Sequence, residues 1–426
     1  MSKENEETLK VYDVHAKTYL KQTVQHKKND PEKAKKKALW LENFCKEGFS
    51  NLHVSAKIME IGAADGENSI MLEKLGFKVT PSDVADDFLK AMQKKKLKPL
   101  KFNLLTDEFP GKFDGIFCWR VFVHFTKEDF WQAMVKIFDA LNFGGRAIFN
   151  VMNADSKDNE NKGWYDFAGE YHMGAERFFQ HFQEKELREN FEKIGFKIIK
   201  LEKTGGEKND KWFCFVLEKS VPINPKLQEY VETEILTQYD PNAGHGVPHI
   251  NYVIRRSFNF AQKVPEANFD MVYTIAAYHD IGRKVDNARH EIESAKILLK
   301  DTRMKEFFSD EELKIIAEAI EDHRASLKRE PRSIYGKIVS SADRNTSVEQ
   351  MLGRLYKYTK SLMPEASEKE VIESARTHLR EKYSPDGYAA TKIFFEDPDY
   401  NDCLKKVEEI TRDYQGFEKI ISDFIE

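Results

Sequence analysis

Long apolar runs are missing from this chain of 426 residues. Residues 115–119 are among the longest, and a helix needs ~20 apolar residues to cross a bilayer. The sequence therefore excludes an integral membrane protein and predicts no membrane partner. Residues 1–10 are charged and lack the apolar segment of a secretory signal. We expect the protein to be cytoplasmic.

Cysteine is also scarce. The four cysteines lie far apart in the chain and form no CxxC pair. This spacing argues against a zinc ribbon and against a disulfide framework, and it fits a reducing compartment. The residues are Cys45, Cys118, Cys214 and Cys403.

Neither sign of charge is in large excess. The chain has 67 basic and 72 acidic residues, which gives a net charge of −5. Residues 1–220 carry +2 and residues 221–426 carry −7. A nucleic-acid-binding domain is usually strongly basic, so we expect no nucleic-acid partner. The 31 phenylalanines and a hydrophobic content of 41% exclude a disordered chain.

Two prolines within residues 221–225 mark the clearest break in the chain. Proline continues neither a strand ladder nor a helix interior, so this segment predicts a linker. It separates a domain of residues 1–220 from a domain of residues 226–426. The oligomeric state is left open by the sequence.

The two predicted domains differ in their hydrophobic patterns. Short apolar runs alternate with helical segments before the linker, which predicts an α/β domain with a parallel sheet. Apolar residues recur at a spacing of 3.6 after the linker, which predicts an all-α domain. The expected strands are 57–61, 77–80, 113–118, 145–152, 197–201 and 212–217, with helices at 67–74, 86–96, 131–141 and 185–193. The expected helices of the second domain are 253–260, 270–279, 290–299, 311–323, 334–344, 348–358 and 368–383.

A strand runs into a turn of small residues at positions 60–66, and a helix follows. Small residues let the backbone approach a ligand closely, and a helix N-terminus favours negative charge. Asp83 ends the next strand, where a carboxylate accepts hydrogen bonds from ribose hydroxyls. A turn and an acid of this kind fit a nucleoside cofactor or a dinucleotide.

Glu60-Ile-Gly-Ala-Ala-Asp-Gly66 together with Asp83 resembles the first two motifs of class I S-adenosylmethionine-dependent methyltransferases. The resemblance covers roughly residues 10–218 and implies a Rossmann-like fold that binds S-adenosylmethionine. The residues that it assigns to the cofactor are Glu60, Gly62, Asp83, Asn103 and Trp119.

One residue departs from that family's pattern, because Ala64 replaces the middle glycine of the turn. Its methyl group restricts φ and could weaken the approach of a cofactor. Tyr12 and Tyr19 resemble the aromatic N-terminal helix that often closes over the cofactor in the family. The acceptor is expected to be a small molecule, with His124 or His172 as a candidate general base.

Six of the twelve histidines lie between residues 245 and 378. His279 and Asp280 follow an apolar helix, and Asp343 follows another. Neutral imidazole and carboxylate together suit a divalent cation such as Mn, Fe, Ni, Co or Zn. A buried His-Asp pair without such a partner is costly.

The order His249, His279-Asp280, Asp343 resembles the HD superfamily of metal-dependent phosphohydrolases. The similarity spans about residues 240–350 and implies that these four residues hold a metal ion. Mg joins Mn, Fe, Ni, Co and Zn as a candidate ion. His290 and His323 match positions that hold a second metal in dinuclear relatives, so one or two ions are expected.

Several residues near His279 and Asp280 are candidates for catalysis or substrate binding. The catalytic candidates are Asp280, His290, His323 and Arg283. A metal-bound water has a lowered pKa and attacks phosphorus, and arginine binds phosphate oxygens in bidentate fashion. His245 is a further candidate for a substrate contact, and His378 is interpreted as structural.

These patterns predict a bifunctional enzyme. The first domain would methylate a small molecule, and the second would hydrolyse a phosphorylated metabolite or nucleotide with a divalent metal. Two alternatives stay open for the second domain. The same histidines and aspartates resemble di-iron oxygenases of the HD superfamily, and a nucleotide-sensing module that regulates the methyltransferase is the other alternative.

Overall fold

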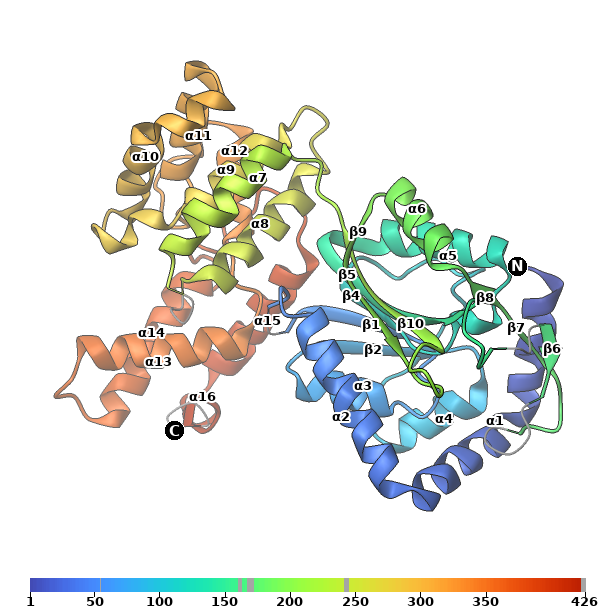
Figure 1. Ribbon diagram of the computed structural model, residues 1–426. Coiled ribbons are helices and arrows are strands. Elements are labelled where there is room, and N and C mark those ends of the chain that lie inside the picture. The colour runs from blue at the N-terminus through green and yellow to red at the C-terminus, as the bar shows by residue number, and fades with distance from the viewer. Residues whose placement is uncertain (54, 160–162, 167–171, 241–244, 423–426) are drawn as a thin grey trace. The chain divides into compact units, whose positions relative to one another are not determined.

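The computed structural model describes residues 1–53, 55–159, 163–166, 172–240 and 245–422 (Figure 1). They form two compact units, Met1–Val221 and Pro222–Glu426. No helix among these residues is long and apolar enough to span a membrane.

Eight strands of the described part of the first unit form one twisted sheet in the order β3-β2-β1-β4-β5-β10-β9, with β8 paired to β5. The strands from β3 to β5 run parallel, and β10 is antiparallel to both of its neighbours. The predicted α/β fold is confirmed. The strands are β1 Lys57–Ile61, β2 Lys78–Asp83, β3 Leu100–Lys101, β4 Phe113–Cys118, β5 Leu141–Asn153, β8 His181–Phe182, β9 Phe196–Thr204 and β10 Trp212–Lys219, and β6 Gly163–Tyr165 pairs with β7 Arg177–Phe179 outside the sheet.

Helices cover both faces of this sheet because its strands are apolar on both sides. In β10, Phe213 and Phe215 join the core beneath α5 and α6, whereas Cys214 and Val216 join the core beneath α2 and α3. This alternation follows from the two-residue repeat of a strand. The helices are α1 Lys3–Asn29, α2 Pro31–Gly48, α3 Glu67–Lys74, α4 Asp86–Lys94, α5 Lys127–Ala140 and α6 Glu184–Ile194, with a short 3₁₀ helix η1 at Phe122–His124.

All regular elements in the described part of the second unit are helices, which confirms the predicted all-α fold. Helix α9 is buried from Met271 to Tyr278, and α8, α11 and α12 pack around it. The longer helices are α8 Val247–Ala261, α9 Phe269–Tyr278, α10 His290–Lys300, α11 Asp310–Glu321, α12 Ile334–Ala342, α13 Val348–Leu362, α14 Glu368–Tyr383, α15 Pro398–Arg412 and α16 Tyr414–Ser422. The shorter ones are α7 Pro225–Tyr230, η2 Val231–Ile235, η3 Leu236–Gln238, η4 Ile281–Lys284 and η5 Thr302–Glu306.

Helices α13 to α16 form a second apolar core, and contacts from α8 fix the segment between α14 and α15. Arg256 of α8 forms an ion pair with Asp397, and the ring of Phe260 stacks on Phe395 at 5.1 Å. These contacts hold the C-terminal helices against the helices that carry the clustered histidines.

Candidate cofactor and metal sites

The turn after β1 brings the backbone close to its neighbours. Gly62 has φ +71°, and a Cβ there would lie 2.3 Å from Cγ2 of Val121, so only glycine fits. Ala64 also lies in the left-handed region, at φ +48°. That conformation costs a residue with a Cβ roughly 1–2 kcal/mol, so other contacts must hold the turn in place.

Asp83 supplies those contacts. Its Oδ2 accepts a hydrogen bond from the Ala64 amide at 2.9 Å, and its Oδ1 accepts from the amides of Val84 at 2.7 Å and Ala85 at 3.2 Å. Burial raises the pKa of Asp83 to about 6, although these hydrogen bonds favour the ionised form. The carboxylate of Asp83 therefore links the end of β2 to the turn after β1. A nucleoside cofactor would bind beside this link.

Glu60 is fully enclosed at the end of β1. Its carboxylate accepts hydrogen bonds from Nδ2 of Asn68 at 3.1 Å and from the hydroxyl of Ser69. Burial raises the pKa of Glu60 to about 7, against the effect of both hydrogen bonds. The side chain thus ties β1 to the first turn of α3, which fixes the direction in which that helix N-terminus points.

The structure does not bring all the predicted cofactor residues together. Asn103 follows β3 and uses its Oδ1 to accept from the Leu105 amide at 3.0 Å. The ring of Trp119 follows β4 and stacks on Phe117, with the ring of Trp40 of α2 at 6.1 Å. Trp119 therefore belongs to the apolar core on the α2 face, which the sequence pattern after β4 did not indicate.

Helix α1 packs over the turn and Asp83. Tyr12 and Tyr19 both contact the ring of Phe88 in α4, at centroid distances of 6.3 Å and 5.7 Å, and the cluster includes Ala64. The burial that α1 provides would shield a bound cofactor from water.

His124 follows β4 and is buried beneath α1. Its Nδ1 lies 2.8 Å from the carbonyl oxygen of Phe178, so Nδ1 carries the proton, and its Nε2 accepts from the hydroxyl of Tyr12 at 2.9 Å. Burial lowers the pKa of His124 to about 3. Both nitrogens are engaged and the ring is a weak base, which argues against the general-base interpretation. His172 is exposed and pairs with Asp166 at 2.9 Å.

The buried, neutral state of His124 predicts a pH-dependent loss of stability. In the unfolded chain a histidine binds a proton below pH ~6.5, whereas folded His124 does not until about pH 3. The unfolded state then binds more protons, so the first unit should lose ~2 kcal/mol between pH 6.5 and 5 from this residue alone. We expect His124→Gln to remove most of that slope, as measured by urea unfolding.

Tryptophan fluorescence isolates this effect, because all five tryptophans precede residue 213 and report on the first unit alone. The exposed His172→Gln variant is the matched control and should keep the wild-type slope. An unchanged slope in His124→Gln would mean that His124 takes up its proton in the folded state.

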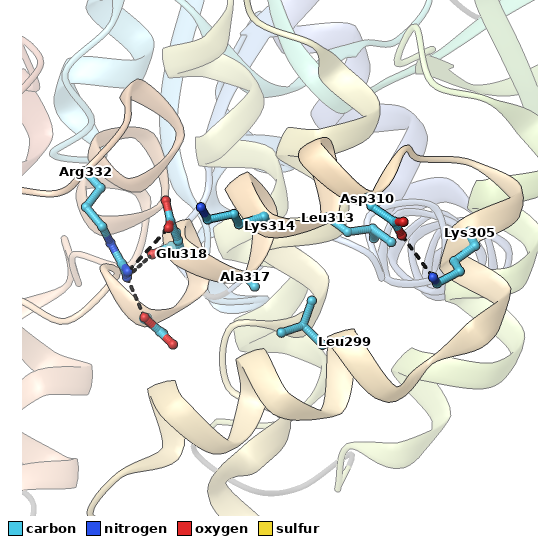
Figure 2. Close-up of a pocket in the computed structure, with 9 residues that line it drawn as sticks. Leu299, Lys305, Asp310, Leu313, Lys314, Ala317, Glu318 and Arg332 are labelled. Carbon is cyan, nitrogen blue, oxygen red and sulfur yellow. Dashed lines mark hydrogen bonds and ion pairs between the residues drawn. The ribbon is translucent and has the colours of Figure 1, made fainter.

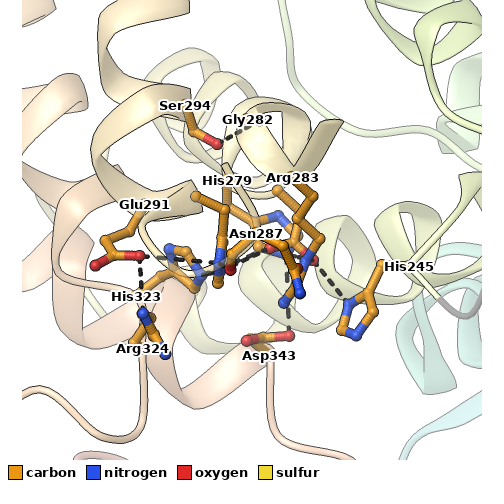
Figure 3. A network of polar contacts seen from close by, with 12 residues as sticks. His245, His279, Gly282, Arg283, Asn287, Glu291, Ser294, His323, Arg324 and Asp343 are labelled. Carbon is orange, nitrogen blue, oxygen red and sulfur yellow. Dashed lines mark hydrogen bonds and ion pairs between the residues drawn. The ribbon is translucent and has the colours of Figure 1, made fainter. Parts of the chain in front are cut away.

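Helices α8, α9 and α12 of the second unit bring the predicted metal ligands together, and Figure 3 shows two of these ligands, His279 and Asp343. His249 lies in the first turn of α8, His279 and Asp280 follow α9, and Asp343 follows α12. Nε2 of His249 lies 3.2 Å from Oδ1 of Asp343, and Nε2 of His279 lies 3.9 Å from the same oxygen.

Asp280 lies between two sets of histidines. Its Oδ2 is 3.7 Å from Nε2 of His249 and 3.6 Å from Nε2 of His279. Its Oδ1 is 3.2 Å from Nε2 of His290 and 3.7 Å from Nε2 of His323. One buried carboxylate therefore faces two groups of donors, each of which is compact enough to hold an ion.

Backbone carbonyls fix the orientation of three of these rings. Nδ1 of His279, His290 and His323 lies within 3.0 Å of a carbonyl oxygen three residues earlier. Each Nδ1 therefore carries the proton, and the lone pair of each Nε2 points into the site. Metal-binding histidines are commonly held in this way.

Two of those lone pairs face each other, because Nε2 of His290 and Nε2 of His323 are 3.2 Å apart. Burial lowers the pKa of His323 to about 4 and also lowers that of His290, so neither ring is easily protonated. Two neutral acceptors at this distance repel each other, and a cation bound between them would relieve the repulsion.

Three of the donor atoms have no hydrogen-bond partner, which also fits a metal site. Nε2 of His249, Nε2 of His279 and Oδ1 of Asp280 are buried and have no hydrogen-bond partner within the described part of the chain. An unsatisfied buried polar atom costs free energy. Nitrogen and carboxylate oxygen are suitable ligands for a divalent cation, so the residues present fit the expected group.

Further side chains surround the donors. Arg283 places Nε 2.8 Å from Oδ2 of Asp280, and Nδ1 of the exposed His245 lies at the same distance from that oxygen. Arg324 pairs with Glu291 at 3.1 Å, an interaction that the sequence did not reveal.

Gly282 explains how α10 reaches the site. A Cβ at this residue would lie 2.5 Å from the Ser294 amide nitrogen and 2.6 Å from the His290 carbonyl oxygen. Glycine therefore permits the close approach of η4 to α10 that brings His290 to Asp280.

A cavity of about 320 Å³ lies elsewhere on the second unit, along α10, η5 and α11 (Figure 2). Four of its charged residues pair with one another: Lys305 with Asp310 at 2.9 Å, and Arg332 with Glu321 at 2.6 Å. We assign no chemistry to it.

Each of the two units contains a segment that matches a known protein family. Residues 26–201 match the methyltransferase domain family, and residues 249–346 match the HD domain family. No relative was found among curated proteins.

Three of the solved structures that resemble the chain are methyltransferases or carry S-adenosylmethionine. One is an S-adenosylmethionine-dependent methyltransferase from Clostridium acetobutylicum, with 15% identity over 42% of this chain and 91% of its own, and a TM-score of 0.36. Another is magnesium protoporphyrin IX methyltransferase from Synechocystis, with 14% identity, 43% and 79% coverage and a TM-score of 0.34. A third is the complex of DhpI with SAM and HEP, with 13% identity, 51% and 99% coverage and a TM-score of 0.41.

The chain is an enzyme in which a methyltransferase domain precedes an HD domain. The two matches confirm the cofactor classes expected from the sequence, which are S-adenosylmethionine for the first domain and a divalent metal ion for the second. They also imply a small-molecule substrate and a phosphate-containing substrate.

Proposed function

We propose that the chain is a bifunctional cytoplasmic enzyme. Residues 1–220 transfer a methyl group from S-adenosylmethionine to a small molecule, and residues 226–426 hydrolyse a phosphoester or nucleotide with a divalent metal. Fusion of the two activities favours related phosphorylated metabolites as their substrates, although fold and fusion alone do not define a substrate.

In the first domain, S-adenosylmethionine supplies an electrophilic methyl group. Asp83 accepts hydrogen bonds from the ribose hydroxyls, and Gly62 lets the backbone approach the cofactor. Glu60 positions the N-terminus of α3. Asn103 and Trp119 complete the proposed set of cofactor contacts, and their side chains also contact Leu105 and Phe117.

In the second domain, a bound divalent metal lowers the pKa of its water and so supplies a nucleophile near neutral pH. His249, His279, Asp280 and Asp343 would hold one ion, and His290 and His323 would hold a second together with Asp280. The observation that carries this proposal is Asp280, whose two oxygens face the two sets of histidines.

Arg283 is proposed to bind the phosphate oxygens. It lies against Asp280, and its guanidinium also donates to Asn287 at 2.9 Å, which limits its freedom. A planar guanidinium held in this way can form two parallel hydrogen bonds to a phosphate. His245 is a further candidate for contact with the substrate.

Removal of the metal tests the hydrolase directly. After chelation and dialysis we expect no phosphate release from a panel of nucleotides, cyclic nucleotides and sugar phosphates. Addition of Mn, Ni, Co or Mg should restore release, and elemental analysis should find about two ions per chain if both sets are filled. A control sample without the chelator separates loss of metal from loss of fold.

The outcomes also separate the alternatives. Protein that is loaded with metal but releases no phosphate or pyrophosphate contradicts the hydrolase. Oxygen uptake after anaerobic loading with iron, with a mixed-valent EPR signal, would then identify an oxygenase. Tight nucleotide binding without turnover would identify a sensor.

A further inference from the structure

A tyrosine of α8 holds the backbone that follows Asp343. The hydroxyl of Tyr252 donates to the carbonyl oxygen of Arg344 at 2.7 Å and lies 3.1 Å from Oγ1 of Thr346. Tyr252 lies three residues after His249, about one turn further along the same helix. The helix that carries one proposed metal ligand therefore also fixes the segment that follows another.

An arginine of α8 holds the backbone that precedes Asp343. Nε of Arg256 donates to the carbonyl oxygen of Ala342 at 3.1 Å, and Nη2 donates to that of Ser341 at 3.3 Å. Carbonyl groups in the last turn of a helix lack the usual partner four residues later, and a cation is favourable at that end. The guanidinium therefore fixes the end of α12 just where Asp343 leaves it.

A carboxylate from the C-terminal part of the chain holds this arginine in place. Asp397 is only 7% exposed, and its Oδ2 pairs with Nη2 of Arg256. Its Oδ1 accepts from the amide of Tyr400 at 3.2 Å and so caps α15. A guanidinium is planar and can serve a carboxylate and neighbouring carbonyl groups together. Displacing Arg256 would leave a buried carboxylate without its partner, which is costly.

The same C-terminal segment contacts the residue after Asp343. The guanidinium of Arg344 lies over the ring of Tyr400 at 5.9 Å, and its Nη2 donates to the carbonyl oxygen of Lys392 at 3.4 Å. The hydroxyl of Tyr400 donates in turn to the carbonyl oxygen of Ala389 at 3.0 Å. These partners lie beyond residue 346, where the match to the HD domain family ends. Segments outside that match therefore support the backbone around a proposed ligand.

The position of this backbone decides where the Asp343 carboxylate lies. Its Oδ1 is 3.2 Å from Nε2 of His249, and the side chain has only one carbon between the backbone and the carboxyl group. A small shift of α12 would therefore move the oxygen away from the other donors. Loss of the contacts that orient a metal ligand commonly weakens metal binding ~10–100-fold.

We propose that Tyr252, Arg256 and Asp397 are positioning residues for the metal centre. They supply no ligand, and they act by fixing the backbone on both sides of Asp343. This inference rests on the proposed metal-dependent function of the second domain. The ion that Asp343 would share with His249 should depend on these three residues. The ion of the second histidine set should not.

Titration of the metal-free full chain with Mn²⁺ tests this proposal, with unbound Mn²⁺ measured by its EPR signal. Wild type should bind about two ions. Tyr252→Phe removes one hydroxyl and should weaken one ion about tenfold, and Arg256→Met should weaken the same ion about 100-fold. Arg256→Lys keeps the charge beside Asp397 but loses the planar fork, so its affinity should be intermediate. The other ion should keep its wild-type affinity.

Lys263→Met is the matched control. Lys263 donates to the carbonyl oxygen of Glu396 at 3.1 Å, so it contacts the same C-terminal segment without touching the backbone near Asp343. Its loss should leave both affinities unchanged. Circular dichroism of the metal-free variants confirms that their helices are intact.

A double variant separates positioning from a general loosening of the second unit. In Asp343→Asn the ion that depends on this carboxylate is already weakened or lost. Adding Tyr252→Phe should then leave the affinity for the remaining ion unchanged, because the tyrosine acts through Asp343. A general loosening would weaken the remaining ion as well.

Three results overturn the proposal. The first is that Tyr252→Phe and both Arg256 variants bind both ions as tightly as wild type. The second is an equal loss of affinity in Lys263→Met. The third is further weakening of the remaining ion in the double variant. Wild type that binds no Mn²⁺ would instead contradict the proposed metal site itself.

Discussion

Replacing Asp280 with asparagine should lower metal-dependent phosphate release about a thousandfold or more. The substitution keeps the shape of the side chain but removes the negative charge that faces both histidine sets. An amide also presents an NH₂ group to one set, where the Nε2 lone pairs need a cation. We expect elemental analysis to find less than one ion per chain after dialysis.

His378→Asn is the matched control for this variant. His378 is an exposed histidine of α14 outside the ligand set, so its loss should change neither metal content nor phosphate release. Binding of S-adenosylhomocysteine should be unaffected in both variants, because its site lies in the other unit. Full phosphate release by Asp280→Asn would show that neither ion depends on this carboxylate.

The metal ligands were predictable because each lies next to a strong local signal. His279 and Asp280 follow a run of apolar residues that is buried throughout as α9. Asp343 follows a similar run in α12. What the sequence could not give is the direction of each side chain. The two oxygens of Asp280 face different histidine sets for two reasons. Backbone carbonyl groups orient the histidine rings, and Gly282 allows η4 to approach α10 closely.

In the first unit, too, the sequence predicts local elements but not the contacts between distant segments. Strand β1 and helix α3 begin and end where the sequence predicts, because the apolar run and the small-residue turn are local features. Helix α2 was not predicted, since the lysines of residues 33–37 suggest only a solvated face. Its opposite face carries Trp40 and Phe44, which meet Trp119 after β4. That contact joins segments far apart in the sequence, so local patterns could not show where the ring of Trp119 packs.

The contacts among Tyr12, His124 and Arg177 are the clearest case of an arrangement that local patterns do not reveal. Tyr12, His124 and Arg177 come from α1, η1 and β7, more than fifty residues apart in each step. A single tyrosine, histidine or arginine at those positions has no distinctive neighbours in the sequence. Their chemistry appears only when the sheet and α1 bring them together.

Replacing Asp83 with alanine should weaken binding of S-adenosylhomocysteine about 100-fold, as measured by calorimetry. The change removes the proposed acceptor of the ribose hydroxyls. It also removes the hydrogen bonds that hold Ala64 in the left-handed conformation and fix Val84 and Ala85. Phosphate release by the second unit should stay at the wild-type level.

Asp86→Ala provides the matched control. Asp86 begins α4 three residues later, and its exposed carboxylate pairs with Lys101 at 2.7 Å, so its loss should leave cofactor affinity unchanged. Equal affinity in Asp83→Ala and wild type would exclude Asp83 from the cofactor site.

Asp83→Asn separates the two roles of this carboxylate. An asparagine oxygen in place of Oδ1 can still accept from the amides of Val84 and Ala85, so the turn is partly preserved, but the acceptor for the Ala64 amide and the negative charge are lost. If the charge matters for the ribose, Asp83→Asn should bind almost as weakly as Asp83→Ala. Wild type should then lose affinity as the pH falls below about 6, where Asp83 becomes protonated, and Asp83→Asn should not. If the turn matters more, Asp83→Asn should bind nearly as well as wild type at every pH.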